Sequence, residues 1–198
     1  MFSSKKNFTK LPWKLLSIEA ALVVFSVLLA LAINSWRQSR SHQQLAQRAL
    51  KGIVEEVERN CARMQSVHPY YQKVVNGQRQ PGGLRIGFIR NQAWDAAKTI
   101  GAGPYIDYEI VAKVEDIYSW QSDHRSIVKS YVTALFTGIL QKEEAEQGKK
   151  ENPEGEKAAM KELVTIQEVL LEDYQELSTQ VEERYGMSID ASNICKEN

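Results

Sequence analysis

Cysteine and histidine are scarce in this sequence, which limits the metal chemistry that it can support. The 198 residues include two cysteines and three histidines. Cys61 and Cys195 are too far apart to form any zinc-ligand pattern, and no histidine lies near another histidine or a cysteine at such a spacing. We therefore expect no metal site. The histidines are His42, His68 and His124.

The two cysteines allow two interpretations. In an exported domain they can pair as a disulfide, because oxidising compartments preserve such bonds. Alternatively, Cys61 lies on the apolar stripe of a predicted helix, where a free cysteine behaves as a small hydrophobic residue. The sequence alone leaves both interpretations open.

Motifs of catalysis and of nucleotide binding are also missing. Gly82, Gly83 and Gly87 do not have the spacing of a dinucleotide-binding loop. Glu115 and Asp116 are adjacent, so on a helix their carboxylates point about 100° apart and do not converge on one substrate. No dense run of lysine and arginine is interleaved with aromatic residues, which argues against nucleic-acid binding. We therefore expect no enzyme, no cofactor and no nucleic-acid partner.

One long hydrophobic run predicts a transmembrane helix over residues 15–36. Its central part carries no charge, and its length matches the roughly 20 apolar residues that cross a bilayer. Glu19 is the one ionisable residue of the run and lies close to one end, where its carboxylate can reach the membrane interface. Trp13 and Trp36 bracket the run as interfacial aromatic residues do. Residues 1–14 form a short basic tail.

A cleaved signal peptide is the competing interpretation. The lysines of the tail resemble a basic leader, and residues 30–32 resemble a small-residue cleavage site. The helical pattern nevertheless continues without a break through Asn34 and Trp36, which favours an uncleaved anchor. Ser26, Ala30 and Asn34 lie four residues apart, so they share a helix face that suits association with another membrane helix.

The charge beside the run predicts its orientation. The tail of residues 1–14 carries four lysines, and a short tail of this kind resists translocation, whereas long domains translocate with little regard to charge. We therefore expect a single-pass protein of a bacterial inner membrane, with its N-terminus in the cytoplasm and its domain in the periplasm.

The remaining residues predict an all-α domain, in which the membrane helix continues into an antiparallel helical bundle. We assign the core of this domain to residues 37–141 and a charged linker to residues 142–156. An acidic helix over residues 157–186 is expected to pack on the bundle, and residues 187–198 form a tail.

Apolar residues recur in alternating steps of three and four in three segments, which is the pattern of helices packed along one face. The first helix is expected to end near Val67, with Pro69 as its boundary, and a further turn or two over residues 70–75 is the alternative. A short helix is expected from Phe88 to Ile100. The three seams comprise Leu50, Val54, Val57, Cys61 and Met64; Ile110, Val114, Ile117, Gln121, His124, Val128, Tyr131 and Leu135; and Met160, Leu163, Gln167, Leu170, Tyr174, Leu177 and Val181.

Charge is balanced overall but unevenly distributed. Residues 37–141 contain 14 Lys and Arg against 9 Asp and Glu, whereas residues 142–198 contain 7 against 15. Arg79, Arg85 and Arg90 lie in or beside a predicted loop and have no acidic neighbour. This loop is either a mobile connector or a contact for anionic lipid headgroups or an acidic partner.

Two stretches resemble a family of uncharacterised bacterial single-pass membrane proteins. They are FSVLLALAINSWRQSR, residues Phe25–Arg40, and AWDAAKTIGAGPYIDYEIVAKVEDIYSWQ, residues Ala93–Gln121. The resemblance extends over about residues 15–121 and does not include the acidic C-terminal helix. It implies an inner-membrane anchor with a helical domain, and it implies no activity.

Two functions agree with these features. The first is a structural or interaction protein without catalysis, which acts as a homo-oligomer or as an accessory subunit of a membrane complex. Its partners would be the lipid bilayer and either another membrane protein or a second copy of itself. The alternative is a binding or sensory module that relays a signal to a partner along a continuous helix over residues 15–67.

Overall fold

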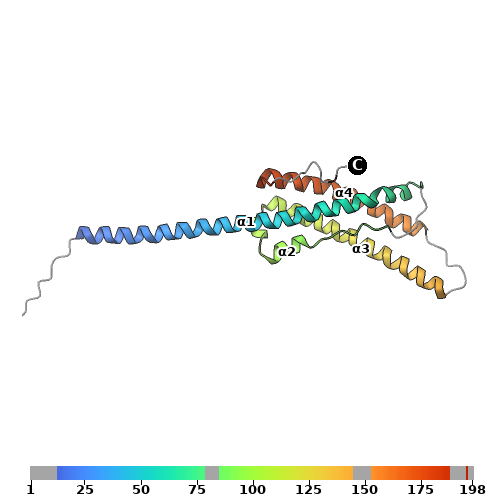
Figure 1. Cartoon of the computed structure of the whole chain (residues 1–198), viewed down its shortest axis with the longest axis horizontal. Coiled ribbons are helices and arrows are strands. Elements are labelled where there is room, and N and C mark those ends of the chain that lie inside the picture. The colour runs from blue at the N-terminus through green and yellow to red at the C-terminus, as the bar shows by residue number, and fades with distance from the viewer. Residues whose placement is uncertain (1–12, 79–84, 145–152, 188–194, 196–198) are drawn as a thin grey trace, which may run out of the picture. The chain divides into compact units, whose positions relative to one another are not determined.

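The computed structural model describes residues 13–78, 85–144, 153–187 and 195, and these residues contain helices and no strand. The elements are α1 (Trp13–Val75), α2 (Ala93–Thr99), a short 3-10 helix η1 (Gly103–Tyr105), α3 (Tyr108–Glu144) and α4 (Pro153–Tyr185) (Figure 1). The predicted all-α fold is therefore confirmed. The chain divides into two compact units, Met1–Gln44 and Leu45–Asn198.

The described part of the first unit is the N-terminal portion of α1. From Leu16 to Trp36 its side chains are exposed, although the most apolar window of the helix has a mean hydropathy of 2.5. Among the described residues, α1 is the one helix long and apolar enough to cross a membrane, judged by its length and composition. Within the part of the chain that the structure describes, no other segment buries these apolar side chains.

The second unit buries a core between α1, α3 and α4. Buried residues from all three helices and from α2 form one large hydrophobic cluster, and a smaller cluster includes Tyr71. Leu50, Ile117 and Leu170 are completely buried, and each contributes about 2 kcal/mol of hydrophobic stabilisation. All the predicted seam residues are buried except Leu135, which is half-buried.

The helices of this unit do not all run in alternating directions. Lys113 forms ion pairs with Asp173 and Glu176, and Arg184 with Asp107 and Glu109, so α3 and α4 are antiparallel as predicted.

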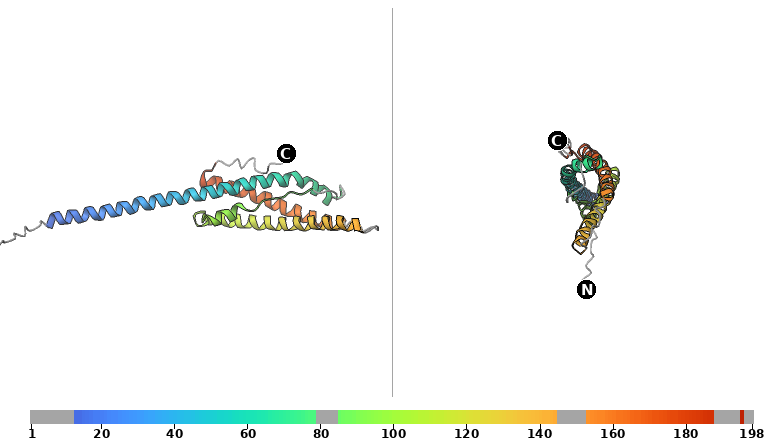
Figure 2. Two further views of the ribbon diagram at one scale, coloured as in Figure 1. Left: turned by 60° about the horizontal axis from the view of Figure 1, so that its bottom comes forward. Right: turned by 90° about the vertical axis from the view of Figure 1, so that its right-hand side faces the viewer.

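By contrast, α1 and α3 run in the same direction (Figures 1 and 2). Parallel neighbours need a connection that returns the chain along the bundle. Residues 85–92, which belong to no helix, form part of this connection, and we call them the strap.

Three predicted boundaries differ from the bounds of the helices in the structure. Helix α1 continues through Pro69 to Val75, because Tyr70, Tyr71 and Val74 extend its buried face, and their burial offsets the roughly 3 kcal/mol that an internal proline costs. The predicted helix from Phe88 starts only at Ala93. The predicted linker over residues 142–156 overlaps both α3 and α4, and residues 145–152 lie outside the described part.

The two ends of α4 follow ordinary capping chemistry. Pro153 begins the helix, where its missing N–H removes a donor that would have no partner within the helix. At the other end, Gly186 has a φ of 59° and donates its N–H to the carbonyl of Glu182. Gly186 is therefore the predicted glycine cap, a position that an L side chain would strain.

Candidate functional site

The predicted anchor residues all lie on the exposed surface of α1. Trp13 is 84% exposed and Trp36 is 60% exposed, and Glu19 is exposed as well. The guanidinium of Arg40 lies over the Trp36 ring, 5.1 Å from its centroid. An aromatic ring stacked with a cation at one end of an apolar run is the arrangement expected at a membrane interface.

The small and polar residues predicted for helix association share an open face. Ser26, Ala30 and Asn34 are all exposed. The Ser26 hydroxyl donates to the carbonyl of Leu22 at 2.7 Å, within its own helix. This bond satisfies the hydroxyl in a bilayer without a partner helix.

A stripe of side chains on α1 binds the backbone of the strap. Asn60 donates to the carbonyl of Arg90 at 2.7 Å and accepts from its N–H at 2.8 Å. One turn further along, Arg63 donates to the carbonyl of Phe88 at 3.3 Å. Tyr71 donates to the carbonyl of Arg85 at 2.7 Å. The strap therefore obtains from helical side chains the hydrogen bonds that a strand obtains from its neighbour.

Close packing of the strap on α1 requires Gly87. A Cβ atom at this position would lie 2.9 Å from Cγ2 of Val67 and 3.2 Å from the carbonyl oxygen of Arg63. The backbone oxygen cannot move without disturbing α1, so any side chain at residue 87 pushes the strap away from the helix. Glycine is needed here for a close approach of two backbones.

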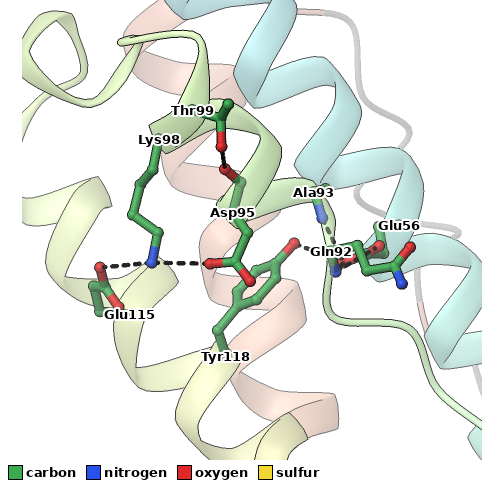
Figure 3. A network of polar contacts seen from close by, with 8 residues as sticks. All are labelled: Glu56, Gln92, Ala93, Asp95, Lys98, Thr99, Glu115 and Tyr118. Carbon is green, nitrogen blue, oxygen red and sulfur yellow. Dashed lines mark hydrogen bonds and ion pairs between the residues drawn. The ribbon is translucent and has the colours of Figure 1, made fainter.

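The strap ends at a buried carboxylate (Figure 3). Glu56 is 4% exposed and accepts from the N–H of Gln92 at 3.1 Å and of Ala93 at 3.3 Å. It also accepts from the Tyr118 hydroxyl at 2.7 Å. Burial, reinforced by this bond to Glu56, raises the pKa of Tyr118 well above its usual value. Glu56 thus caps α2 from a different helix and joins α1, α2 and α3.

The surface part of the same region is held by ordinary ion pairs. Lys98 on α2 lies 3.1 Å from Asp95 and 3.8 Å from Glu115 on α3 (Figure 3). These side chains are about half-exposed or more, so each pair contributes well under about 1 kcal/mol. The buried Glu56 contacts, rather than the Lys98 pairs, therefore fix the position of α2.

A second polar group crosses the bundle through Gln167 of α4. Its amide oxygen accepts from Nδ1 of His68 on α1 at 3.0 Å, and its amide nitrogen donates to Nε2 of His124 on α3 at 3.1 Å. Because Nε2 of His124 is an acceptor, the neutral ring carries its proton on Nδ1. That buried Nδ1 has no hydrogen-bond partner among the described residues.

The buried His124 makes stability depend on pH. Burial lowers its pKa to about 4, from an unfolded value near 6.5, so protonation favours the unfolded chain. The stabilisation is complete above pH 6.5 and is lost as the pH falls toward 4. We expect a loss of about 2 kcal/mol between pH 7 and pH 5.

Urea unfolding of the full chain in nanodiscs at several pH values measures this loss. His124→Gln is expected to remove most of the pH dependence, and His42→Gln, at a half-buried histidine of α1, serves as the control. An unchanged slope in His124→Gln would show that other groups cause it.

Two grooves border the strap. One, of about 400 Å³, lies between the strap and α3 and is lined by Phe88, Ile89, His124, Arg125 and Val128, together with other α3 residues. The other, of about 450 Å³, lies on the α1 side and includes Arg63 and Arg90. The grooves share residues 87–89 of the strap.

Of the arginines predicted as an anion contact, the two that the structure describes, Arg85 and Arg90, have different surroundings. Arg85 lies over the Tyr70 ring, 5.0 Å from its centroid. Arg90 lines the groove on the α1 side together with Arg63, and Arg79 lies outside the described residues. Arg125 and Lys129 could not be predicted as groove residues, because only the course of the strap places them beside it.

A disulfide joins Cys61 on α1 to Cys195, with 5.6 Å between the Cα atoms. The sequence left this pairing open, and the structure forms it. The bond connects positions 134 residues apart and attaches the end of the predicted tail to the core. Within the described ranges, no group of three His, Cys, Asp or Glu side chains is placed to hold a metal ion.

Comparisons with known proteins add no relative. No family model, no curated protein and no solved structure matches the chain. The resemblance to bacterial single-pass membrane proteins therefore stays a prediction.

Proposed function

We propose that this protein is a membrane-anchored helical interaction protein whose domain serves as an accessory subunit or homo-oligomer at the membrane surface. The observation that carries the proposal is the run from Leu16 to Trp36, whose apolar side chains have no protein cover. An apolar helix of this length is stable in water only if something covers it, and a bilayer is the simplest cover.

The disulfide supports export of the domain. Structural disulfides persist in oxidising compartments and are rare in the cytosol. Together with the lysines of the tail, the Cys61–Cys195 bond favours a cytoplasmic N-terminus and a periplasmic domain in a bacterial inner membrane.

The exposed surface of the second unit supports an interaction role. Tyr108 is 83% exposed, Ile100 54% and Tyr105 41%, and all three lie within nine residues around η1. Exposed aromatic and aliphatic residues close together are typical of protein contacts. The face formed by Ser26, Ala30 and Asn34 would serve the same purpose inside the membrane.

The topology can be tested with a chain tagged at both ends. We expect the full-length, doubly tagged protein to stay in membranes after alkaline washing, with only the C-terminal tag open to protease in spheroplasts. Leu28→Arg, at the middle of the run, should reduce membrane retention because a central arginine costs about 3 kcal/mol, whereas Leu28→Ile should not. Loss of the N-terminal tag would indicate a cleaved signal peptide and overturn the anchor.

The partner can be sought by crosslinking the native-level protein in membranes and identifying the products by mass spectrometry. A stoichiometric foreign chain would identify an accessory subunit, and crosslinks between copies alone would identify a homo-oligomer. Recovery of an uncrosslinked monomer alone would contradict the interaction role.

The groove between the strap and α3 favours a second candidate, a binding or sensory module. Its ligand would change the position of the strap, which contacts α1 through Asn60 and Arg63. Because α1 also contains the apolar run, a change in the contacts between the strap and α1 would be transmitted along this helix to a partner in or across the membrane.

A further inference from the structure

We propose that the groove between the strap and α3, which we call the strap groove, binds a small amphipathic carboxylate. It is a ligand with one carboxylate and a compact apolar body. This inference does not rest on the anchored interaction role, because the groove lies within the second unit and would bind a soluble ligand whether or not a protein partner exists.

The apolar part of the ligand has a defined surface to contact. Phe88 and Ile89 contribute from the strap, and Val128 and Val132 contribute from α3. Phe88 is 62% exposed, an unusual exposure for a phenylalanine beside a concave surface. The volume of about 400 Å³ is in the range of small-molecule sites. Covering Phe88 would remove apolar area from water, which favours an apolar ligand body.

The charges of the groove select an anion. Arg125 and Lys129 both line it and lie one turn apart on α3, whereas no aspartate or glutamate is among its lining residues. The Arg125 guanidinium donates to the side-chain oxygen of Asn91, at the end of the strap. This contact positions the guanidinium at the groove, where its other N–H groups are available to a carboxylate.

One of the buried donors without a partner among the described residues, Nδ1 of His124, belongs to a residue of the same groove. His124 is completely buried and lines the groove, and its ring is held by Gln167 with the proton on Nδ1. A buried N–H without an acceptor is uncommon in folded proteins and calls for a partner. An oxygen of a bound carboxylate, directly or through a water molecule, supplies the missing acceptor. Three donors of the groove thus favour an acceptor-rich anion.

Naphthoate is a suitable probe because it combines a rigid apolar body with one carboxylate, and naphthalenemethanol is its neutral counterpart. We would titrate both into the full chain in zwitterionic nanodiscs by calorimetry, with empty nanodiscs as the blank. We expect saturable binding of naphthoate and at least tenfold weaker binding of the alcohol. Absence of saturable naphthoate binding, or equal binding of the two probes, would overturn the proposal.

Variants locate the binding. Arg125→Met with Lys129→Met is expected to weaken naphthoate binding at least tenfold and to leave binding of the alcohol unchanged. Val132→Phe should weaken both probes by filling the groove. Lys161→Met, an exposed lysine on α4, is the matched control and should bind like the parent chain. A loss in Lys161→Met equal to that in the double variant, with all variants folded by circular dichroism, would place binding outside the strap groove.

Discussion

Replacing Cys61 and Cys195 with alanine together is expected to lower the free energy of unfolding by about 4 kcal/mol, the largest effect that we expect from any change to this chain. The reason is the length of chain that the bond closes. The two residues are 134 positions apart, so the unfolded chain loses much conformational freedom when they are joined. Urea unfolding of the full chain in nanodiscs, followed by circular dichroism, measures the difference.

Reduction of the bond provides the matched control. A reductant should destabilise the parent chain by about the same amount as the double substitution. It should have no effect on Cys61→Ala with Cys195→Ala. If the parent chain unfolds at the same urea concentration with and without reductant, the bond does not hold the native fold together.

Glu56→Ala is expected to destabilise the second unit by about 3 kcal/mol, because it leaves buried donors without an acceptor. The carboxylate is 4% exposed and accepts from two backbone N–H groups and from the Tyr118 hydroxyl. The same urea titration measures the loss, and hydrogen exchange should show faster exchange at Gln92 and Ala93.

Two further variants test whether the destabilisation by Glu56→Ala comes only from the loss of a negative charge or only from the loss of the hydrogen bond to Tyr118. Glu55→Ala removes a half-exposed neighbour that lies 3.7 Å from Arg59, and it should change stability by less than about 0.5 kcal/mol. Tyr118→Phe removes only one donor and should cost about 1 kcal/mol. Equal effects of Glu55→Ala and Glu56→Ala would show that the buried contacts of Glu56 contribute little.

The helices and their buried faces were predictable because each one follows from a local repeat. The seam from Ile110 to Tyr131 has a spacing of three and four residues, and that spacing alone assigns one face to the core. Pro69 was misinterpreted for the same reason. A proline ends a helix considered by itself, but buried Tyr70 and Tyr71 stabilise the continuation, and their burial depends on distant residues.

The strap and its groove were not predictable from local patterns. The sequence around Gly87 indicates a loop, and nothing in it shows that the backbone will lie against α1. Glu56, Asn60 and Arg63 supply the contacts, and in the sequence they resemble an ordinary solvated helix face. Glu56 and Asn60 directly precede the seam residues Val57 and Cys61, and this proximity to the seam was the one available signal, since buried polar side chains need partners.

The pairing of Cys61 with Cys195 determines how the domain would bear mechanical load. Tension applied between the apolar run of α1 and the chain beyond residue 195 would pass along α1 to Cys61, cross the sulfur–sulfur bond and leave at Cys195. Helices α2, α3 and α4 lie on the closed covalent loop between these two points, outside the load-bearing path. In the oxidised protein such a pull would leave the strap groove and most of the bundle unloaded, whereas in the reduced protein it would unravel them.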